Sequence, residues 1–241
     1  MEAKLKSAIR RIPWSLVLKT GAVGVIWLTL PVWIAVCAAL CFYFVPAFQV
    51  RKLALSFALF LWFLAFLDPT PWRAILIASI FYLILGIKDL VLIDRASAYE
   101  TLILLIVAGL FLQFFSQAEF PVGLRMLAST SLLGFLFFLL MRGFLHHPDT
   151  PPSLFRPTSG FREFFLAALG GFVIWQGAIV LLFLPINLFY QSAILFLIAL
   201  VFLEVFPYHN GGRLTRGRVV MIFSAFFVLS TVIAATAEWN L

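Results

Sequence analysis

Residues 142–163 read RGFLHHPDTPPSLFRPTSGFRE, and this stretch is the longest polar interruption in a chain that otherwise consists of apolar runs. It holds two of the three histidines and four of the twelve prolines. Five hydrophobic blocks precede it and three follow it. The chain is therefore organised as eight hydrophobic segments on either side of one polar loop.

The composition places most of the chain in lipid. Of its 241 residues, 64% are hydrophobic and 11% are charged, whereas a soluble domain carries about 25% charged residues. A soluble fold of this length cannot cover so much apolar surface, because its surface must be largely polar. The net charge of +7 does not indicate nucleic-acid binding, since the basic residues stand at the ends of apolar blocks, where they orient the chain and contact lipid headgroups.

The block lengths predict an all-α fold, a polytopic integral membrane helical bundle with about eight hydrophobic segments and seven to nine crossings. Two of the blocks have roughly 15 apolar residues each, which is short for a full crossing, so they form either two tight spans or a re-entrant hairpin. The eight blocks are residues 20–45, 53–67, 74–87, 99–115, 126–141, 164–184, 188–206 and 219–237.

Residues 1–19 are predicted to form a cationic amphipathic helix that lies in the membrane interface, ahead of a transmembrane bundle of residues 20–241. Apolar residues at helical spacing are flanked here by lysines and arginines, and Trp14 is placed as an interfacial anchor. The alternative is a frayed basic tail. The first block, 20–45, fits one span, but a run counted from Trp14 to Val45 has Pro31 near its centre and is compatible with a helical hairpin.

The distribution of basic residues predicts the orientation of the bundle. Loops 46–52, 88–98, 142–163 and 207–218 lie on one side of it and together hold ten lysines and arginines, whereas the opposite loops hold only Arg73 and Arg125. The positive-inside rule therefore predicts that the four basic loops are cytoplasmic, in a cell (plasma) membrane. The N-terminal segment adds five positive charges. A hairpin in the first block would keep them on the cytoplasmic surface too, and it satisfies the rule best.

Small residues gather in block 164–184. Ala167 and Gly171 form a small-xxx-small pair, and Gly170 and Gly177 recur one heptad apart. In lipid such faces allow helices to approach closely, so this helix is predicted to be the centre of the bundle.

Few polar residues are candidates for chemistry. Imidazoles combined with carboxylates suit a zinc site, but a His-His-x-Asp string is too common to identify one, and the separation of five between Glu204 and His209 is not that of a metalloprotease. We predict no metal site and no cofactor, and a hydrated or pH-responsive loop instead. The candidate polar site consists of His146, His147, Asp149, Glu204 and His209.

Other polar groups favour structural roles. Gln113 and Gln176 are mid-span amides, which usually form hydrogen bonds between helices. Glu204, near the end of its span, is expected to be hydrated or salt-bridged. A last set is predicted to form a salt-bridged surface patch at the level of the headgroups, and comprises Lys88, Asp89, Asp94, Arg95 and Glu100.

Three classes of function remain. The chain has no Walker loop, no Gly-x-Ser-x-Gly and no His-Glu-x-x-His, and this favours a non-enzymatic membrane subunit or scaffold whose partners are the bilayer and other membrane subunits. A transporter or channel for a small or lipid-like solute requires Gln113, Gln176 and Glu204 to face one cavity. A membrane-interface enzyme acting on a lipid or lipid-linked phosphate would use the candidate polar site with nearby arginines.

Overall fold

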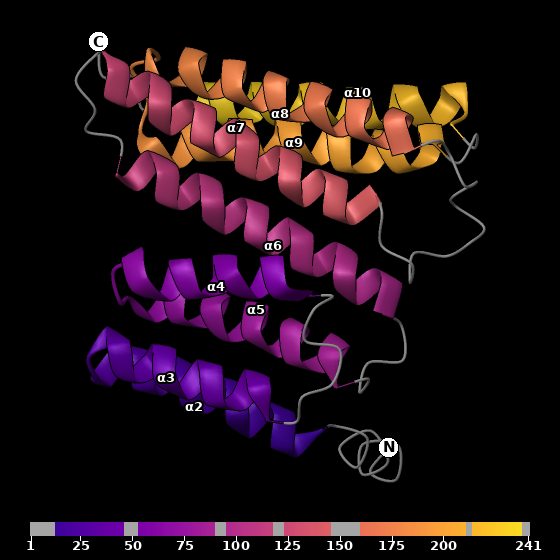
Figure 1. The fold of residues 1–241 in the computed structure, drawn as a ribbon. Coiled ribbons are helices and arrows are strands. Elements are labelled where there is room, and N and C mark those ends of the chain that lie inside the picture. Colours follow the sequence, from indigo (N-terminus) through magenta and orange to yellow (C-terminus); the bar gives the residue numbers. More distant parts are fainter. Residues whose placement is uncertain are drawn as a thin grey trace, which may run out of the picture. The chain divides into compact units, whose positions relative to one another are not determined.

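The computed structural model describes residues 13–45, 53–89, 95–117, 123–145, 160–210 and 214–237. Within these ranges the regular elements are α-helices, which confirms the all-α class (Figure 1). The described helices are α2 (Trp14–Thr29), α3 (Val32–Phe44), α4 (Ala54–Phe66), α5 (Pro71–Lys88), α6 (Arg95–Ser116), α7 (Leu124–Leu145), α8 (Gly160–Leu182), α9 (Leu188–Asn210) and α10 (Arg216–Thr236).

Six of the described helices, α5 to α10, are long and apolar enough to cross a bilayer. Helices α2, α3 and α4 are apolar too, but they have 16, 13 and 13 residues, fewer than the roughly 20 that a crossing needs. The chain is therefore a multi-pass membrane protein by length and composition. The count of seven to nine crossings stays a prediction.

The first hydrophobic block is two helices joined at Leu30 and Pro31. Both residues have extended backbone angles, with ψ of 163° and 142°, and α2 and α3 pack against each other. A proline at the first turn of a helix is favourable, whereas inside one it removes a hydrogen bond, so α3 starts directly after Pro31. The helical-hairpin alternative is confirmed. Residues 1–12 of the predicted interfacial helix lie outside the described residues, and Trp14 already belongs to α2.

The chain divides into two compact units, Met1–Leu102 and Ile103–Leu241. In the first unit α2 packs on α3 and α5, and α4 packs on α3 and α5. Stacked aromatic rings fill its core: the rings of Tyr43 and Phe57 lie 3.6 Å apart, and those of Phe60 and Phe81 lie 4.9 Å apart. Each of these four side chains is at most 5% exposed, so they hold three helices together by apolar contact.

A hydrogen bond ties α2 to α4 in the same core. The indole N–H of Trp27, which is buried, donates to the backbone oxygen of Leu64 at 2.9 Å. We expect Trp27→Phe to lower the free energy of unfolding by about 1 to 2 kcal/mol, because the ring volume is largely kept while a buried acceptor loses its partner. The measurement is unfolding by SDS in detergent micelles. Trp33→Phe is the control, since Trp33 is 67% exposed; equal effects of the two substitutions would contradict the assignment.

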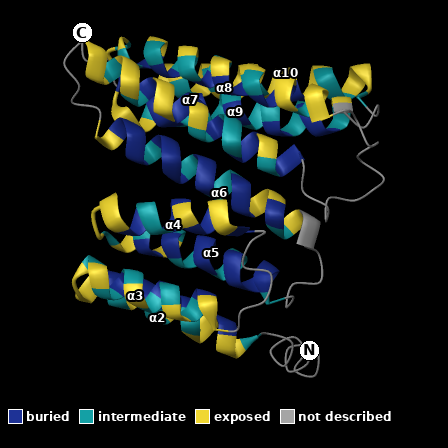
Figure 2. Cartoon of the chain, in the orientation of Figure 1, coloured by how far each residue is buried: buried dark blue, intermediate teal, exposed yellow. Residues whose placement is uncertain are grey.

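In the second unit α8 lies between α7 and α9, and α10 packs on α9. Ala167, Gly170 and Gly171 of α8 are buried, and Gly177 is half-buried. Gly170 faces the ring of Phe137, and Gly177 faces the side chain of Leu195. The small residues of α8 therefore lie at helix contacts, and the place of this helix at the centre of the whole bundle stays a prediction. α10 is mostly exposed along its length (Figure 2).

Candidate functional site

Arg162 and His209 meet at one end of the second unit. Arg162 stands in the first turn of α8 and His209 in the last turn of α9, and the short connection at residues 183–187 makes these two helices antiparallel. Arg162 Nη2 lies 3.2 Å from His209 Nε2. A guanidinium only donates hydrogen bonds, so in a hydrogen bond between these two groups Nε2 of His209 is the acceptor. Both side chains are exposed, so the contact adds little stability.

Two more arginines stand over aromatic rings at this end. The Arg218 guanidinium of α10 lies 3.5 Å from the centre of the Tyr208 ring of α9, and that of Arg142, at the end of α7, lies 5.9 Å from the ring of Phe164 in α8. Arginine over an aromatic face is a favourable cation–π arrangement. These contacts bring the ends of α7, α8, α9 and α10 together. The end carries positive charge, and such clusters attract anionic phosphates.

The predicted polar site is only partly within the described residues: His146, His147 and Asp149 lie outside them. Glu204 is half-buried on α9 and forms no ion pair with the described residues. α9 runs through Pro207 to Asn210, beyond the expected end of the span. Glu204 and His209 therefore lie on one helix, where a separation of five residues places them about 140° apart around the axis, and they do not converge.

Metal-binding side chains do not gather in the described ranges. No three or more His, Cys, Asp or Glu side chains lie close enough there to hold a metal ion. Lone imidazoles and carboxylates do not hold zinc, which takes at least three protein ligands even in catalytic sites.

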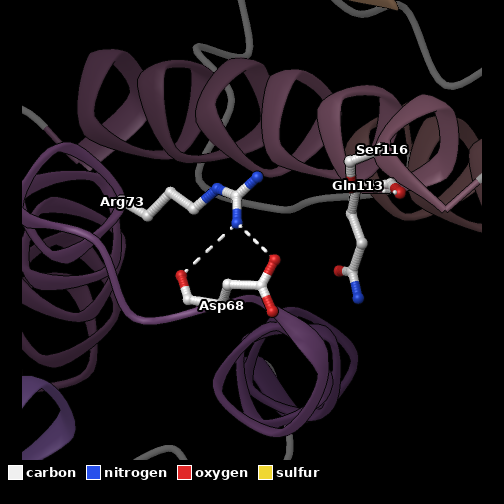
Figure 3. A network of polar contacts seen from close by, with 4 residues as sticks. All are labelled: Asp68, Arg73, Gln113 and Ser116. Atoms are coloured by element: carbon white, nitrogen blue, oxygen red, sulfur yellow. Dashed lines mark hydrogen bonds and ion pairs between the residues drawn. The ribbon is translucent and has the colours of Figure 1, made fainter.

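Gln113 and Gln176 differ in their surroundings. Gln113, on α6, is fully buried, and neither its side-chain oxygen nor its nitrogen has a hydrogen-bond partner in the described part of the chain. The nearby Ser116 hydroxyl donates to the Gln113 backbone oxygen at 2.9 Å, not to the amide (Figure 3). Gln176 is exposed on α8. Two apolar grooves of the second unit contain none of Gln113, Gln176 and Glu204, so the shared cavity that a transporter would need has no support there.

A buried charge is the feature that sequence reasoning missed. Lys88, the last residue of α5, is 0% exposed, and its Nζ lies 2.7 Å from Asp89 Oδ1. Asp89 Oδ1 accepts no hydrogen bond from the described residues, so its contact with Lys88 is an ion pair. The ammonium also lies 5.7 Å from the centre of the Tyr43 ring. Of the five residues predicted to form a salt-bridged surface patch, Lys88 and Asp89 form an ion pair, and Lys88 is buried instead of lying at the surface. Asp94 and the side chain of Arg95 lie outside the described parts, and Glu100 is exposed.

Comparison with known protein families, curated proteins and solved structures found no match for this chain. Its function therefore has to be inferred from its own residues and geometry.

The pair Asp68–Arg73, in the turn between α4 and α5, contrasts with the buried pair. Arg73 Nη1 lies 3.0 Å from Asp68 Oδ2 and 3.4 Å from the Asp68 backbone oxygen (Figure 3). The Asp68 side chain is 87% exposed and that of Arg73 is 22% exposed. Water and salt screen such a pair. The Asp68–Arg73 pair therefore adds little stability to the turn and does not form a binding site.

Proposed function

We propose that this chain is a non-enzymatic subunit of a membrane assembly, and that α10 is the helix that contacts a neighbouring subunit. The exposure of α10 carries the proposal. Ile222 is the single buried residue of α10, whereas between 33% and 67% of the most apolar 18-residue stretch is buried in each of the other five long helices.

Exposure of apolar side chains to lipid is not itself unfavourable, because lipid tails are as apolar as the side chains. Two further features of α10 support a protein neighbour. First, residues of α8, α9 and α10 line an apolar groove of about 380 Å³, so the side of α10 that faces its own unit is not fully packed there. Second, one exposed line of small or β-branched residues runs along α10 at coiled-coil spacing.

This line, the α10 seam, consists of Ser224, Val228, Thr231 and Ala235, all of them exposed. The separations of four, three and four residues keep one face of a helix toward a partner helix. The Thr231 hydroxyl already donates to the Phe227 backbone oxygen at 2.8 Å, so this hydroxyl is satisfied within the helix. Small side chains let helix backbones approach in lipid, and the seam therefore fits a transmembrane helix of another subunit.

Site-specific photo-crosslinking in native membranes tests the proposal. Cys37 and Cys41, both free and exposed, are replaced by alanine, and a single cysteine carrying a benzophenone is placed at Val228 in the seam. The matched control carries it at Val180 of α8, which has a similar exposure of 61% against 59%. We expect one discrete protein adduct from position 228 and none from position 180, with mass spectrometry deciding between a second copy of the chain and another membrane protein.

A substitution that places a bulky side chain in the α10 seam provides a second test of the proposal. Ser224→Phe fills the seam one turn from Val228, on an exposed position where it does not disturb the chain's own packing. It is expected to abolish the adduct while the unfolding transition stays unchanged. Adducts to lipid alone at both positions, or an adduct that survives Ser224→Phe, would contradict the proposal.

A further inference from the structure

A groove of about 390 Å³ runs along the junction of α7 and α8 on the surface of the second unit. This volume lies in the range of small-molecule sites. The groove is open and has apolar walls, and three of its wall rings, Phe135, Phe164 and Phe172, are about half exposed. The walls are formed by the rings of Phe135, Phe138, Phe164, Phe172 and Trp175.

The groove exists because two glycines line it where the helices touch. A Cβ atom on Gly134 would lie 2.8 Å from the Gly171 backbone oxygen, and a Cβ atom on Gly171 would lie 2.8 Å from the Gly134 backbone oxygen. The backbones are therefore in direct contact here, and no side chain rises between the flanking aromatic rings. An open apolar groove with a backbone floor fits one flexible hydrocarbon chain.

A cation stands at one end of this groove. The Arg142 guanidinium lies 5.9 Å from the centre of the Phe164 ring, and this ring packs edge-on against Phe138, another wall of the groove, at 5.4 Å. Arg142 is exposed, and no carboxylate of the described residues lies within ion-pair distance of it. The guanidinium is therefore free to bind an anion that reaches the mouth of the groove.

The length of the groove matches one leaflet. Ser131, which also lines it, precedes Arg142 by eleven residues on the same helix, which corresponds to a rise of about 16 Å. Half of the hydrocarbon core of a bilayer is about 15 Å thick. A hydrocarbon chain lying beside Trp175 and Ser131 at one end would thus place its headgroup near Arg142 at the other.

We propose that this groove binds one acyl chain of an anionic phospholipid, whose phosphate pairs with Arg142. The apolar groove selects the chain, and the unpaired guanidinium, which can bind a phosphate in a bidentate manner, selects the headgroup. The site does not involve α10 and is independent of the proposed partner of that helix.

Two photoactivatable lipid probes test the proposal on the full chain in nanodiscs. Both carry the same diazirine acyl chain; one has a phosphatidylglycerol headgroup and the other a phosphatidylcholine headgroup. Mass spectrometry maps the labelled residues. We expect labelling within 131–138 and 164–175 to be about fivefold higher with the anionic probe, the ratio expected from one additional cation–headgroup attraction. Arg142→Gln should bring the ratio to about one, and Arg216→Gln, at an exposed arginine of α10, should leave it unchanged.

A second variant distinguishes the contribution of the apolar groove to lipid binding from that of the Arg142 charge. Ala168→Phe, at a half-buried position in the groove wall, should lower labelling by both probes without changing the charge at Arg142. The wild-type ratio is decisive even if a variant fails to fold. Equal labelling by the two probes, or labelling around Val180 of α8 at the same yield as in the groove, would show ordinary surrounding lipid and overturn the proposal.

Discussion

Gly171→Leu is expected to lower the free energy of unfolding by about 3 kcal/mol or more, a large effect for one substitution. The new Cβ atom would lie 2.8 Å from the Gly134 backbone oxygen and 2.9 Å from the Cβ atom of Phe138. Neither neighbour is the end of a flexible side chain, so α7 and α8 must separate, and theirs is the most extensive helix contact among the described elements. Unfolding by SDS in detergent micelles, followed by far-ultraviolet circular dichroism, measures the change.

A matched control is available on α10. Gly217→Leu adds the same side chain where nothing lies within 4 Å, and it should change stability by less than about 0.5 kcal/mol. Gly171→Ala isolates the contact further, because alanine favours a helix by about 1 kcal/mol over glycine and should still destabilise if the Cβ atom alone collides. Similar unfolding midpoints for the leucine variants at Gly171 and Gly217 would refute the close contact between α7 and α8.

The sequence predicted that block 164–184 would pack closely, but it did not identify Gly134 as the partner of Gly171. Small residues at helical spacing indicate a face that another helix can approach. Which residue lies opposite depends on the crossing point of two helices, and this is set by all the side chains of the contact. The small-residue pattern of one segment therefore predicts which face of that helix packs closely. Only the structure shows which residue of the neighbouring helix lies opposite.

The helix break at Pro31 was likewise only partly predictable from the sequence. Its position near the middle of a long apolar run made a hairpin possible, but proline also occurs inside transmembrane helices, where neighbouring groups satisfy the freed backbone. Composition alone could not separate these cases. The structure has the break, with α3 starting directly after Pro31.

Of the candidate site, His209 lies in a described contact, and the sequence did not predict the arrangement of that contact. Histidines, arginines and a carboxylate were expected at the loop ends, yet the contact between Arg162 and His209 joins residues 47 positions apart and requires the antiparallel pairing of α8 and α9. Lys88 was misplaced for another reason. A lysine at the end of an apolar block usually reaches the interface, whereas here the packing of the first unit covers it completely.

Asp89→Ala is expected to destabilise the protein by about 3 to 5 kcal/mol, because it removes the carboxylate that lies beside the buried ammonium of Lys88. The pair is short, with 2.7 Å between Nζ and Oδ1, and the Asp89 side chain is 15% exposed. Desolvation makes an uncompensated charge far more costly than a lost surface pair. The same SDS unfolding measurement applies.

Removing both charges should recover much of this loss. Lys88→Met keeps a long apolar side chain against Tyr43, so the double variant Lys88→Met/Asp89→Ala removes both charges of the pair and should be more stable than Asp89→Ala alone. Arg73→Gln, which breaks the exposed Asp68–Arg73 pair, should cost less than about 1 kcal/mol. If Asp89→Ala destabilised no more than Arg73→Gln, or if the double variant were the least stable of the set, Lys88 would have to be hydrated in the folded protein. Its burial in the first unit would then be excluded.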